Sequence, residues 1–267
     1  MTKVTIYILT HKKFNEEYDS NLYKPLLNGS ALIDNDFGYL RDDSGNNISK
    51  LNIYYAELTG QYWAWKNSNA EVIGFTHYRR WFARDIRFNK LTKNDILKDL
   101  NSYDIILPQK TVGNDSIKNG IKKSLKDNPN YGAKWEDYVK LGNLLKNKFP
   151  GYYESYIKII NGNEGYNCNM FICRKELADQ YFSWLFDVLE ELKDVIDFSS
   201  YPEGNKRVLG FFSEYLLTTF VYKHNLKIKE HYIINIERKF PILSILKPKY
   251  PFLSSIEHKI VNYKLKH

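Results

Sequence analysis

The sequence has few cysteines and no long apolar run, and each absence excludes a class of protein. Its only cysteines are Cys168 and Cys173, which lie within one apolar segment. Their spacing is neither a CxxC motif nor a disulfide framework, so we expect a reduced, cytosolic protein. The first apolar run, at 4–9, is too short for a signal peptide, and no later run approaches the length of a membrane span.

Several catalytic motifs are also missing. The chain contains no GxGxxG after a predicted strand, no GxxxxGK(S/T), no GxSxG and no HExxH. The six histidines are scattered, and no two of them have the spacing of metal ligands. Dinucleotide oxidoreductases, nucleotide hydrolases and zinc hydrolases are therefore disfavoured.

Aromatic residues and positive charge are abundant instead. Hydrophobic residues make up 43% of the 267 residues and aromatic residues 16%, including 22 tyrosines. A surplus of tyrosine suits ligands that are stacked and hydrogen-bonded at once, although an AT-rich genome produces a similar composition. The net charge is +8, and +7 of it lies from Lys223 onwards, where ten Lys and Arg face three Glu. We therefore expect the basic end of the chain to meet an anionic partner.

Strand and helix patterns alternate along the chain. Apolar, β-branched runs predict strands at 3–10, 71–76, 103–107, 166–173 and 227–236. Amphipathic spacing predicts helices at 49–67, 93–100, 134–146, 152–160, 175–192 and 207–222. The polar, lysine-rich stretch 111–130 is expected to be a mobile loop or lid. The alternation predicts an α/β fold with a mainly parallel central sheet flanked by helices.

Charged residues follow the first two predicted strands, at the edge where open α/β sheets bind their ligands. The polar residues after the first strand suit the base and phosphates of a nucleotide, and they equally suit a solvated loop. Two adjacent arginines after the second strand are planar, permanently charged donors for a diphosphate, or else a structural ion-pair site. The candidate donor-binding residues are Thr10, His11, Lys12, His77, Tyr78, Arg79 and Arg80.

The predicted strand at 166–173 carries two asparagines in apolar surroundings. A buried amide is costly unless it is hydrogen-bonded, so Asn167 and Asn169 either bind nearby backbone or face the hydroxyl groups of a sugar. The candidate acceptor- or sugar-binding residues are Tyr166, Asn167, Asn169, Arg207 and Ser213.

Glu214 is the candidate catalytic residue. It lies among aromatic and aliphatic residues of the predicted helix at 207–222, an environment that holds a carboxylate as a base or nucleophile. A buried ion pair of Glu214 with Arg207 or Arg79 is the structural alternative.

Taken together, these segments resemble a bacterial family of capsular, exopolysaccharide and O-antigen glycosyltransferases labelled as a domain of unknown function, DUF4422. The likeness covers most of 3–235 and is most specific in the central stretch that ends in His77-Tyr78-Arg79-Arg80. Its strongest pieces are 47–52, 57–67, 73–80, 169–172 and 210–214. The resemblance implies transfer of a sugar, often galactose in pyranose or furanose form, from a UDP-sugar to a lipid-linked glycan.

The resemblance also implies a layout similar to GT-A transferases, in which an Asp-x-Asp motif after a strand holds a divalent metal on the donor diphosphate. Here the strand at 71–76 ends in histidine, tyrosine and two arginines, which can neutralise the leaving diphosphate without a metal. A metal is therefore compatible with the sequence but not expected. Asp34 and Asp36 have the motif's spacing and are the fallback ligands, although their surroundings favour a turn.

The role of Glu214 depends on the stereochemistry that the resemblance leaves open. In an inverting enzyme it would be the general base that removes the acceptor hydroxyl proton. In a retaining enzyme it would be a nucleophile or a stabiliser of an oxocarbenium-like transition state.

Two parts of the chain are expected to differ in role. Residues 1–238 are predicted to form one GT-A-like, Rossmann-type domain, and 239–267 a basic amphipathic C-terminal tail. The tail's mixture of apolar residues and lysines suits an anionic bilayer surface, or packing on the domain with lysines in water. The expected partners are a UDP-sugar, a polyprenyl-diphosphate-linked glycan and the inner face of the cell membrane, where the protein would be cytoplasmic and peripheral.

Two other functions compete with sugar transfer. Basic charge and aromatic residues also suit a protein that binds nucleic acid or another anionic polymer without catalysis. Because the charge lies at the end of the chain and the body has no basic stripe, we do not expect nucleic acid as a partner. A catalytically silent, sugar-binding homologue is the third possibility.

Overall fold

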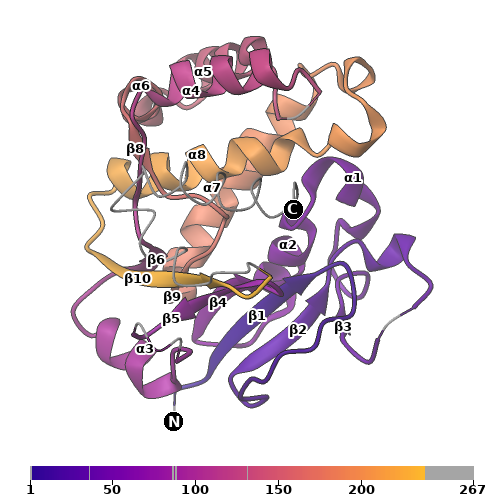
Figure 1. Cartoon of the computed structure of the whole chain (residues 1–267), viewed down its shortest axis with the longest axis vertical. Coiled ribbons are helices and arrows are strands. Elements are labelled where there is room, and N and C mark those ends of the chain that lie inside the picture. The colour runs from indigo at the N-terminus through magenta and orange to yellow at the C-terminus, as the bar shows by residue number, and fades with distance from the viewer. Residues whose placement is uncertain (1, 36, 86, 88, 131, 238–267) are drawn as a thin grey trace, which may run out of the picture.

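The computed structural model describes residues 2–35, 37–85, 87, 89–130 and 132–237. The predicted tail at 239–267 and the fallback metal ligand Asp36 lie outside these residues. Within them, eight strands form one sheet in the order β3-β2-β1-β4-β5-β10-β6-β9, and helices cover one face in two layers (Figure 1). No helix in the described part of the chain has the length and apolar character needed to cross a bilayer.

The first four strands form the parallel half of the sheet. They are β1 (Val4–Thr10), β2 (Tyr23–Leu27), β3 (Leu40–Arg41) and β4 (Val72–His77). All seven residues of β1 are buried, which accounts for its continuous apolar, β-branched sequence. In the register of β1 with β4, Leu9 pairs with His77, so the polar residues that follow both strands emerge at the same edge.

The other four strands make the sheet mixed, so the expectation of a mainly parallel sheet is confirmed only in part. They are β5 (Arg80–Ala83), β6 (Ile105–Pro108), β9 (Ile172–Arg174) and β10 (Ile228–Asn235). Strand β5 runs antiparallel to β4 and β10, and β9 runs antiparallel to β4 and β6, so these two strands run against the other six. Strand β5 is reversed because the chain turns back at Tyr78–Arg79 instead of crossing over through a helix. A separate pair joins β7 (Thr111–Val112) to β8 (Glu164–Gly165).

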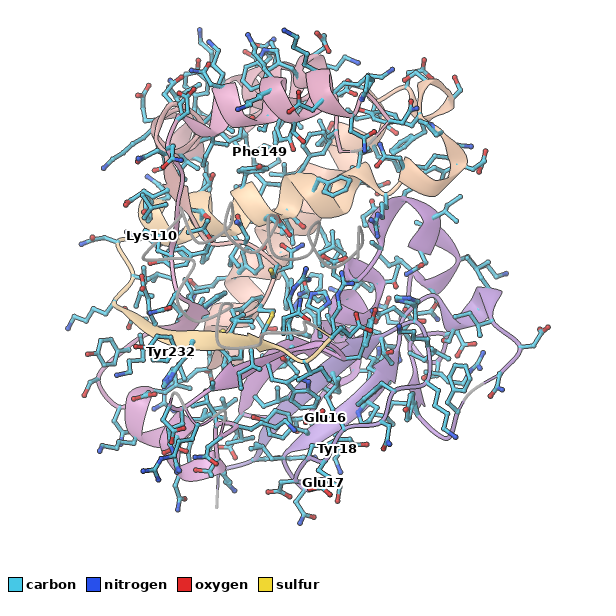
Figure 2. The ribbon with its side chains drawn as sticks, in the orientation of Figure 1. Glu16, Glu17, Tyr18, Lys110, Phe149 and Tyr232 are labelled. Atoms are coloured by element: carbon cyan, nitrogen blue, oxygen red, sulfur yellow. The ribbon has the colours of Figure 1, made fainter. Side chains whose placement is uncertain are left out.

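The helices form an inner and an outer layer (Figure 1). Those near the sheet are α1 (Asn52–Tyr55), α2 (Leu58–Asn67), α7 (Lys175–Lys193) and α8 (Val208–Lys223). The outer ones are α4 (Ile117–Asp127), α5 (Trp135–Lys148) and α6 (Pro150–Asn161), while α3 (Lys93–Asp99) lies near the opposite face. Phe149, between α5 and α6, packs onto the core beneath the outer helices (Figure 2). Helix α8 is apolar because it lies between the sheet and this outer layer.

Two predicted elements on the helical side of the sheet differ from the structure. The helix predicted at 49–67 is interrupted at Ala56, whose positive φ of 49° ends α1 and starts a new helix after Glu57. The loop predicted at 111–130 contains β7 and helix α4 instead. Ser116 caps α4 by accepting a hydrogen bond from the Asn119 N–H, and the apolar edge of the helix packs onto the core. Its many lysines mask this narrow apolar edge in the sequence.

Candidate active site

A pocket with a volume of about 600 Å³ opens at the carboxyl ends of β1 and β4. This is the edge at which open α/β sheets bind their ligands. One side, the cationic wall, follows the strands and consists of His11, Tyr78, Arg79 and Arg80. The other side, the carboxylate wall, comes from the α1–α2 junction and the start of α8 and consists of Glu57, Arg207, Phe211 and Glu214.

The cationic wall is built by the tight turn between β4 and β5. His77 pairs with Arg80 across this turn, which leaves Tyr78 and Arg79 at its tip. The His11 ring meets the Tyr78 ring edge-on, with 5.3 Å between the ring centroids. The pKa of His11 is lowered, first by burial and then by the positive charges of Lys12 and Arg79, so His11 adds no charge at neutral pH.

Arg79 has polar capacity left for a ligand. Its guanidinium lies 3.6 Å from the exposed carboxylate of Glu237, which also accepts a hydrogen bond of 3.1 Å from Lys12. The buried Nε–H of Arg79 has no hydrogen-bond partner among the described residues. An anion that reached this group would satisfy it, and a planar guanidinium suits the oxygens of a phosphate.

The carboxylate wall holds Glu214 in poorly solvated surroundings. Its Oε1 accepts a hydrogen bond of 3.0 Å from the Cys168 N–H. Burial raises the pKa of Glu214 to about 7, and the negative charge of Glu57 adds to the rise, while the Cys168 N–H and Arg80 oppose it. A carboxylate with this pKa can accept a proton near neutral pH.

The segment between these walls is a turn, so the prediction of a strand over 166–173 is wrong except for its last two residues, which belong to β9. Cys168 and Asn169 adopt positive φ values of 79° and 49°. Asparagine tolerates this conformation, but cysteine rarely adopts it, which is why the sequence does not indicate the turn. The Cys168 carbonyl lies 3.0 Å from Nε2 of His77. Burial lowers the pKa of His77, which favours a neutral ring that donates this hydrogen bond.

The structure brings seven of the sequence-predicted residues into the pocket lining. They are His11, His77, Tyr78, Arg79, Arg80, Arg207 and Glu214. The pocket lining does not include Thr10, Lys12, Tyr166, Asn167, Asn169 or Ser213.

These six residues have other positions. Asn167 is exposed, whereas Asn169 is buried behind the carboxylate wall. The Tyr166 hydroxyl donates a hydrogen bond of 2.8 Å to Glu230, and the Ser213 hydroxyl donates one of 2.8 Å to the Gly210 carbonyl. The hydroxyl of Thr10 donates to the backbone carbonyl of Lys12.

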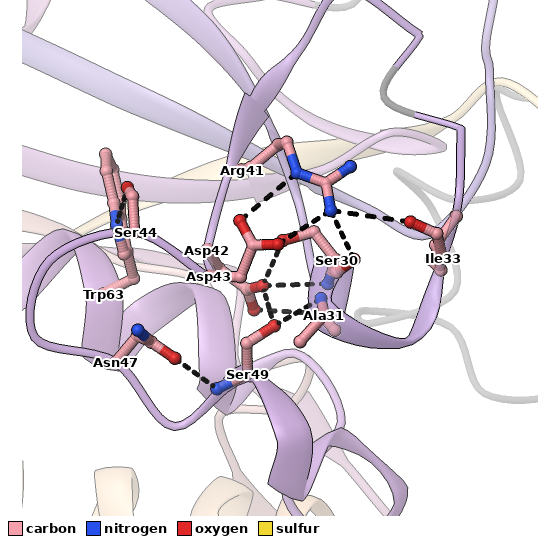
Figure 3. Close-up of polar contacts among 11 residues, drawn as sticks. Ser30, Ala31, Ile33, Arg41, Asp42, Asp43, Ser44, Asn47, Ser49 and Trp63 are labelled. Atoms are coloured by element: carbon pink, nitrogen blue, oxygen red, sulfur yellow. Dashed lines mark hydrogen bonds and ion pairs between the residues drawn. The ribbon is translucent and has the colours of Figure 1, made fainter.

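Four amide or carboxylate residues of the pocket lining were not selected from the sequence: Asn28, Asn52, Glu57 and Glu203. Asn28 precedes Gly29 in the chain, and Asn52 packs against Gly29. The Gly29 N–H donates to Asp42, a fully buried carboxylate at the centre of a hydrogen-bond network (Figure 3). Gly29 belongs to this network and has a φ of +65°, and a Cβ atom there would lie 2.5 Å from Cγ of Asn52. The glycine that follows Asn28 was the feature of the sequence that could have pointed to this residue. Nothing in the sequence distinguishes Glu57 from a surface glutamate.

The fallback metal ligands are not in this pocket as far as the structure describes them. Asp34 is exposed and does not line the pocket, and Asp36 lies outside the described residues. Nowhere in the described ranges do three or more histidine, cysteine, aspartate or glutamate side chains gather as metal ligands would. Metal binding by Asp34 and Asp36 stays a prediction.

Comparison with known proteins identifies the family. The sequence profile described as "Domain of unknown function (DUF4422)" matches residues 5–225. The chain belongs to the DUF4422 family. Among solved structures it is similar to one titled as the apo structure of WbbM, a bifunctional glycosyltransferase, with 27% identity and a TM-score of 0.74. The match covers 89% of this chain and 46% of the other, so the DUF4422 chain spans about half of that protein. No curated protein matches.

Proposed function

We propose that this DUF4422 chain is a glycosyltransferase that moves a sugar from a UDP-sugar to a lipid-linked glycan. The observation that carries the proposal is a single pocket that joins two adjacent arginines, Arg79 and Arg80, to a carboxylate with a raised pKa, Glu214. The similarity to a bifunctional glycosyltransferase supports the reaction class. The choice of UDP and of galactose, as pyranose or furanose, follows from the family resemblance.

The two walls suit the two halves of the reaction. As the bond between the sugar C1 and the diphosphate oxygen breaks, the diphosphate leaves with the electron pair, and Arg79 and Arg80 stabilise its charge. The acceptor hydroxyl oxygen forms the new bond to C1. In an inverting enzyme its proton passes to Glu214, and in a retaining enzyme Glu214 acts as a nucleophile or stabilises the oxocarbenium-like transition state.

The acceptor would approach from the helical side of the pocket. Phe211 offers a ring there, and the Arg207 guanidinium lies 5.7 Å from its centroid. An aromatic face next to a cationic donor suits a sugar ring and its hydroxyl groups. We further propose that the basic segment 239–267 keeps the enzyme on the inner face of the cell membrane, where a polyprenyl-diphosphate acceptor would lie.

A calorimetric screen of UDP-, GDP-, CMP- and dTDP-sugars, each in EDTA and in Mn²⁺, tests the proposal. We expect one UDP-sugar to bind selectively, and to bind equally well in EDTA because the arginines neutralise the diphosphate. Binding that requires Mn²⁺ would overturn the metal-free assignment. If no nucleotide sugar binds in either condition, the transferase proposal is wrong, and binding to anionic polymers becomes the next function to measure.

A further inference from the structure

The turn at Cys168–Asn169 contacts every element that supplies the carboxylate wall. The Cys168 N–H holds Glu214, and the Cys168 carbonyl lies 3.0 Å from Nε2 of His77. The Asn169 carbonyl accepts a hydrogen bond of 2.7 Å from the side chain of Gln61 on α2. Two residues therefore fix a side chain of α8, one of β4 and one of α2 relative to one another.

The side chain of Asn169 adds the contact that matters most. Its Nδ2 donates 2.8 Å to Oε1 of Glu57 and 3.1 Å to the Gly210 carbonyl at the start of α8. Asn169 is only 1% exposed, and its Oδ1 has no hydrogen-bond partner among the described residues. If the amide were flipped, Oδ1 would face Oε1 of Glu57 and the Gly210 carbonyl, which are both acceptors. These two groups therefore fix the orientation of the Asn169 amide. The unsatisfied oxygen is the cost of holding Glu57.

The charges around Glu214 give this contact a chemical consequence. The groups that face Glu214 are Glu57 from the α1–α2 junction, Arg80 from β5, Cys168 from the turn, Tyr138 from α5 and Tyr215 from α8 itself. The other negative charge in this set is Glu57. The position of Glu57 therefore decides how strongly the proton affinity of Glu214 is raised beyond the effect of burial.

We propose that Asn169 is a positioning residue that holds the Glu57 carboxylate in the pocket wall that also carries Glu214, which the neighbouring Cys168 N–H holds. Asn169 does not line the pocket, so it acts through Glu57 and not on the substrate. The proposal deepens the proposed transferase function and rests on it for the catalytic meaning of Glu214. The electrostatic relation between the two glutamates can be measured whether or not sugar is transferred.

The test follows the titration of Glu214 by ¹³C NMR in protein with labelled glutamate, with Glu214→Gln used to assign the signal. Asn169→Gly keeps the left-handed backbone, and Glu57→Gln keeps the shape of the side chain. We expect each change to lower the pKa of Glu214 by about one unit, since each removes or releases a neighbouring negative charge. The low-pH limb of the transfer rate should move down with it.

The double variant decides whether Asn169 acts through Glu57. Adding Asn169→Gly to Glu57→Gln should shift the titration no further, because the charge is already gone. Asn167→Ala is the matched control: it changes an exposed side chain of the same segment that does not line the pocket, so the titration of Glu214 should not move. An unchanged Glu214 titration in Glu57→Gln, or equal additive shifts in the double variant, would overturn the inference. If the variants shift the Glu214 titration as expected but the wild-type chain transfers no sugar, only the transferase proposal is contradicted.

Discussion

Asp42 and Glu214 are two desolvated carboxylates with opposite surroundings. Asp42 is 0% exposed and accepts hydrogen bonds from the Gly29 and Ser30 N–H groups and from the hydroxyls of Ser30 and Ser49 (Figure 3). Glu214 accepts one hydrogen bond, from the Cys168 N–H, and meets the charge of a second carboxylate. Asp42 therefore fastens a loop, whereas Glu214 keeps lone pairs available for a proton.

The comparison shows that burial alone does not mark a catalytic carboxylate. The number of donors aimed at the oxygens separates a structural group from a reactive one, because each donor stabilises the charged form and uses up an acceptor site. The pocket needs both groups. The Asp42 network fixes the loop that carries Asn28, and Glu214 is the reactive group of the proposed transfer.

The largest effect should come from Glu214→Gln. The amide keeps the shape of the side chain but cannot accept a proton, so we expect the transfer rate to fall by about 100- to 10,000-fold. The dissociation constant of the donor should stay within about twofold of wild type, since the cationic wall is intact. Glu191→Gln, an exposed glutamate on α7, is the control and should keep full activity. Full transfer by Glu214→Gln would remove its catalytic role.

Alanine at Arg79 or Arg80 should weaken donor binding by about 1.5–3 kcal/mol, the usual value of a charge-assisted hydrogen bond. Calorimetric titration with the UDP-sugar measures this loss. Arg84→Ala is the matched control, because this exposed arginine pairs with Asp85 and does not line the pocket. If both pocket variants bind the donor as tightly as wild type, the diphosphate lies elsewhere.

Asp42→Asn should affect stability instead of chemistry. Oδ1 accepts from three of the four donors and Oδ2 from the Gly29 N–H, so a new NH₂ group in the place of Oδ2 would face that donor. We therefore expect the free energy of unfolding to fall by about 2–3 kcal/mol in urea titrations. Asp43→Asn, which loses a half-exposed ion pair with Arg41, should cost less than about 1 kcal/mol. Equal losses from the two substitutions would show that the four donors give Asp42 no special weight.

The pH dependence should report Glu214 directly. Because its pKa is raised to about 7 and the deprotonated form accepts the proton, kcat should rise with pH and level off above about pH 7. Below that value kcat should fall about tenfold per pH unit. The raised folded-state pKa also favours folding at pH values below the ordinary 4.5, a contribution that is lost as the pH rises through about 7. A kcat that falls only near pH 4.5 would contradict the raised pKa of Glu214.

The smallest effect should come from Glu237→Gln, and it should be a gain. Glu237 lies beside Lys12 and Arg79, so its carboxylate competes with a diphosphate for the cationic wall. Both ion pairs are exposed to solvent and therefore weak, so donor affinity should rise no more than about fivefold. The gain should shrink in 0.5 M salt, because salt screens exposed charges. Weaker binding would mean that Glu237 helps to orient Arg79.

The sequence predicted the elements with strong local patterns. The strand at 3–10 and the helix at 175–192 are confirmed as β1 and α7 to within a residue at each end, because continuous burial and amphipathic spacing are properties of neighbouring residues. The break at Ala56 and the turn at Cys168 were missed. Both depend on positive φ values at residues that rarely adopt them, which only contacts distant in the sequence can enforce.

The sequence by itself determined the family, the α/β class and the two arginines after a buried strand. These features depend on residues that are close together in the sequence. Arg79, Arg80 and Glu214 became candidate site residues because of the residues next to them in the chain. Tertiary structure alone decided that Glu57 faces Glu214 and that Asn169 holds it from behind the wall. Glu57 and Asn169 are 112 positions apart in the sequence. The proton affinity of a carboxylate depends on the charges and donors packed around it, and the order of residues along the chain does not specify these.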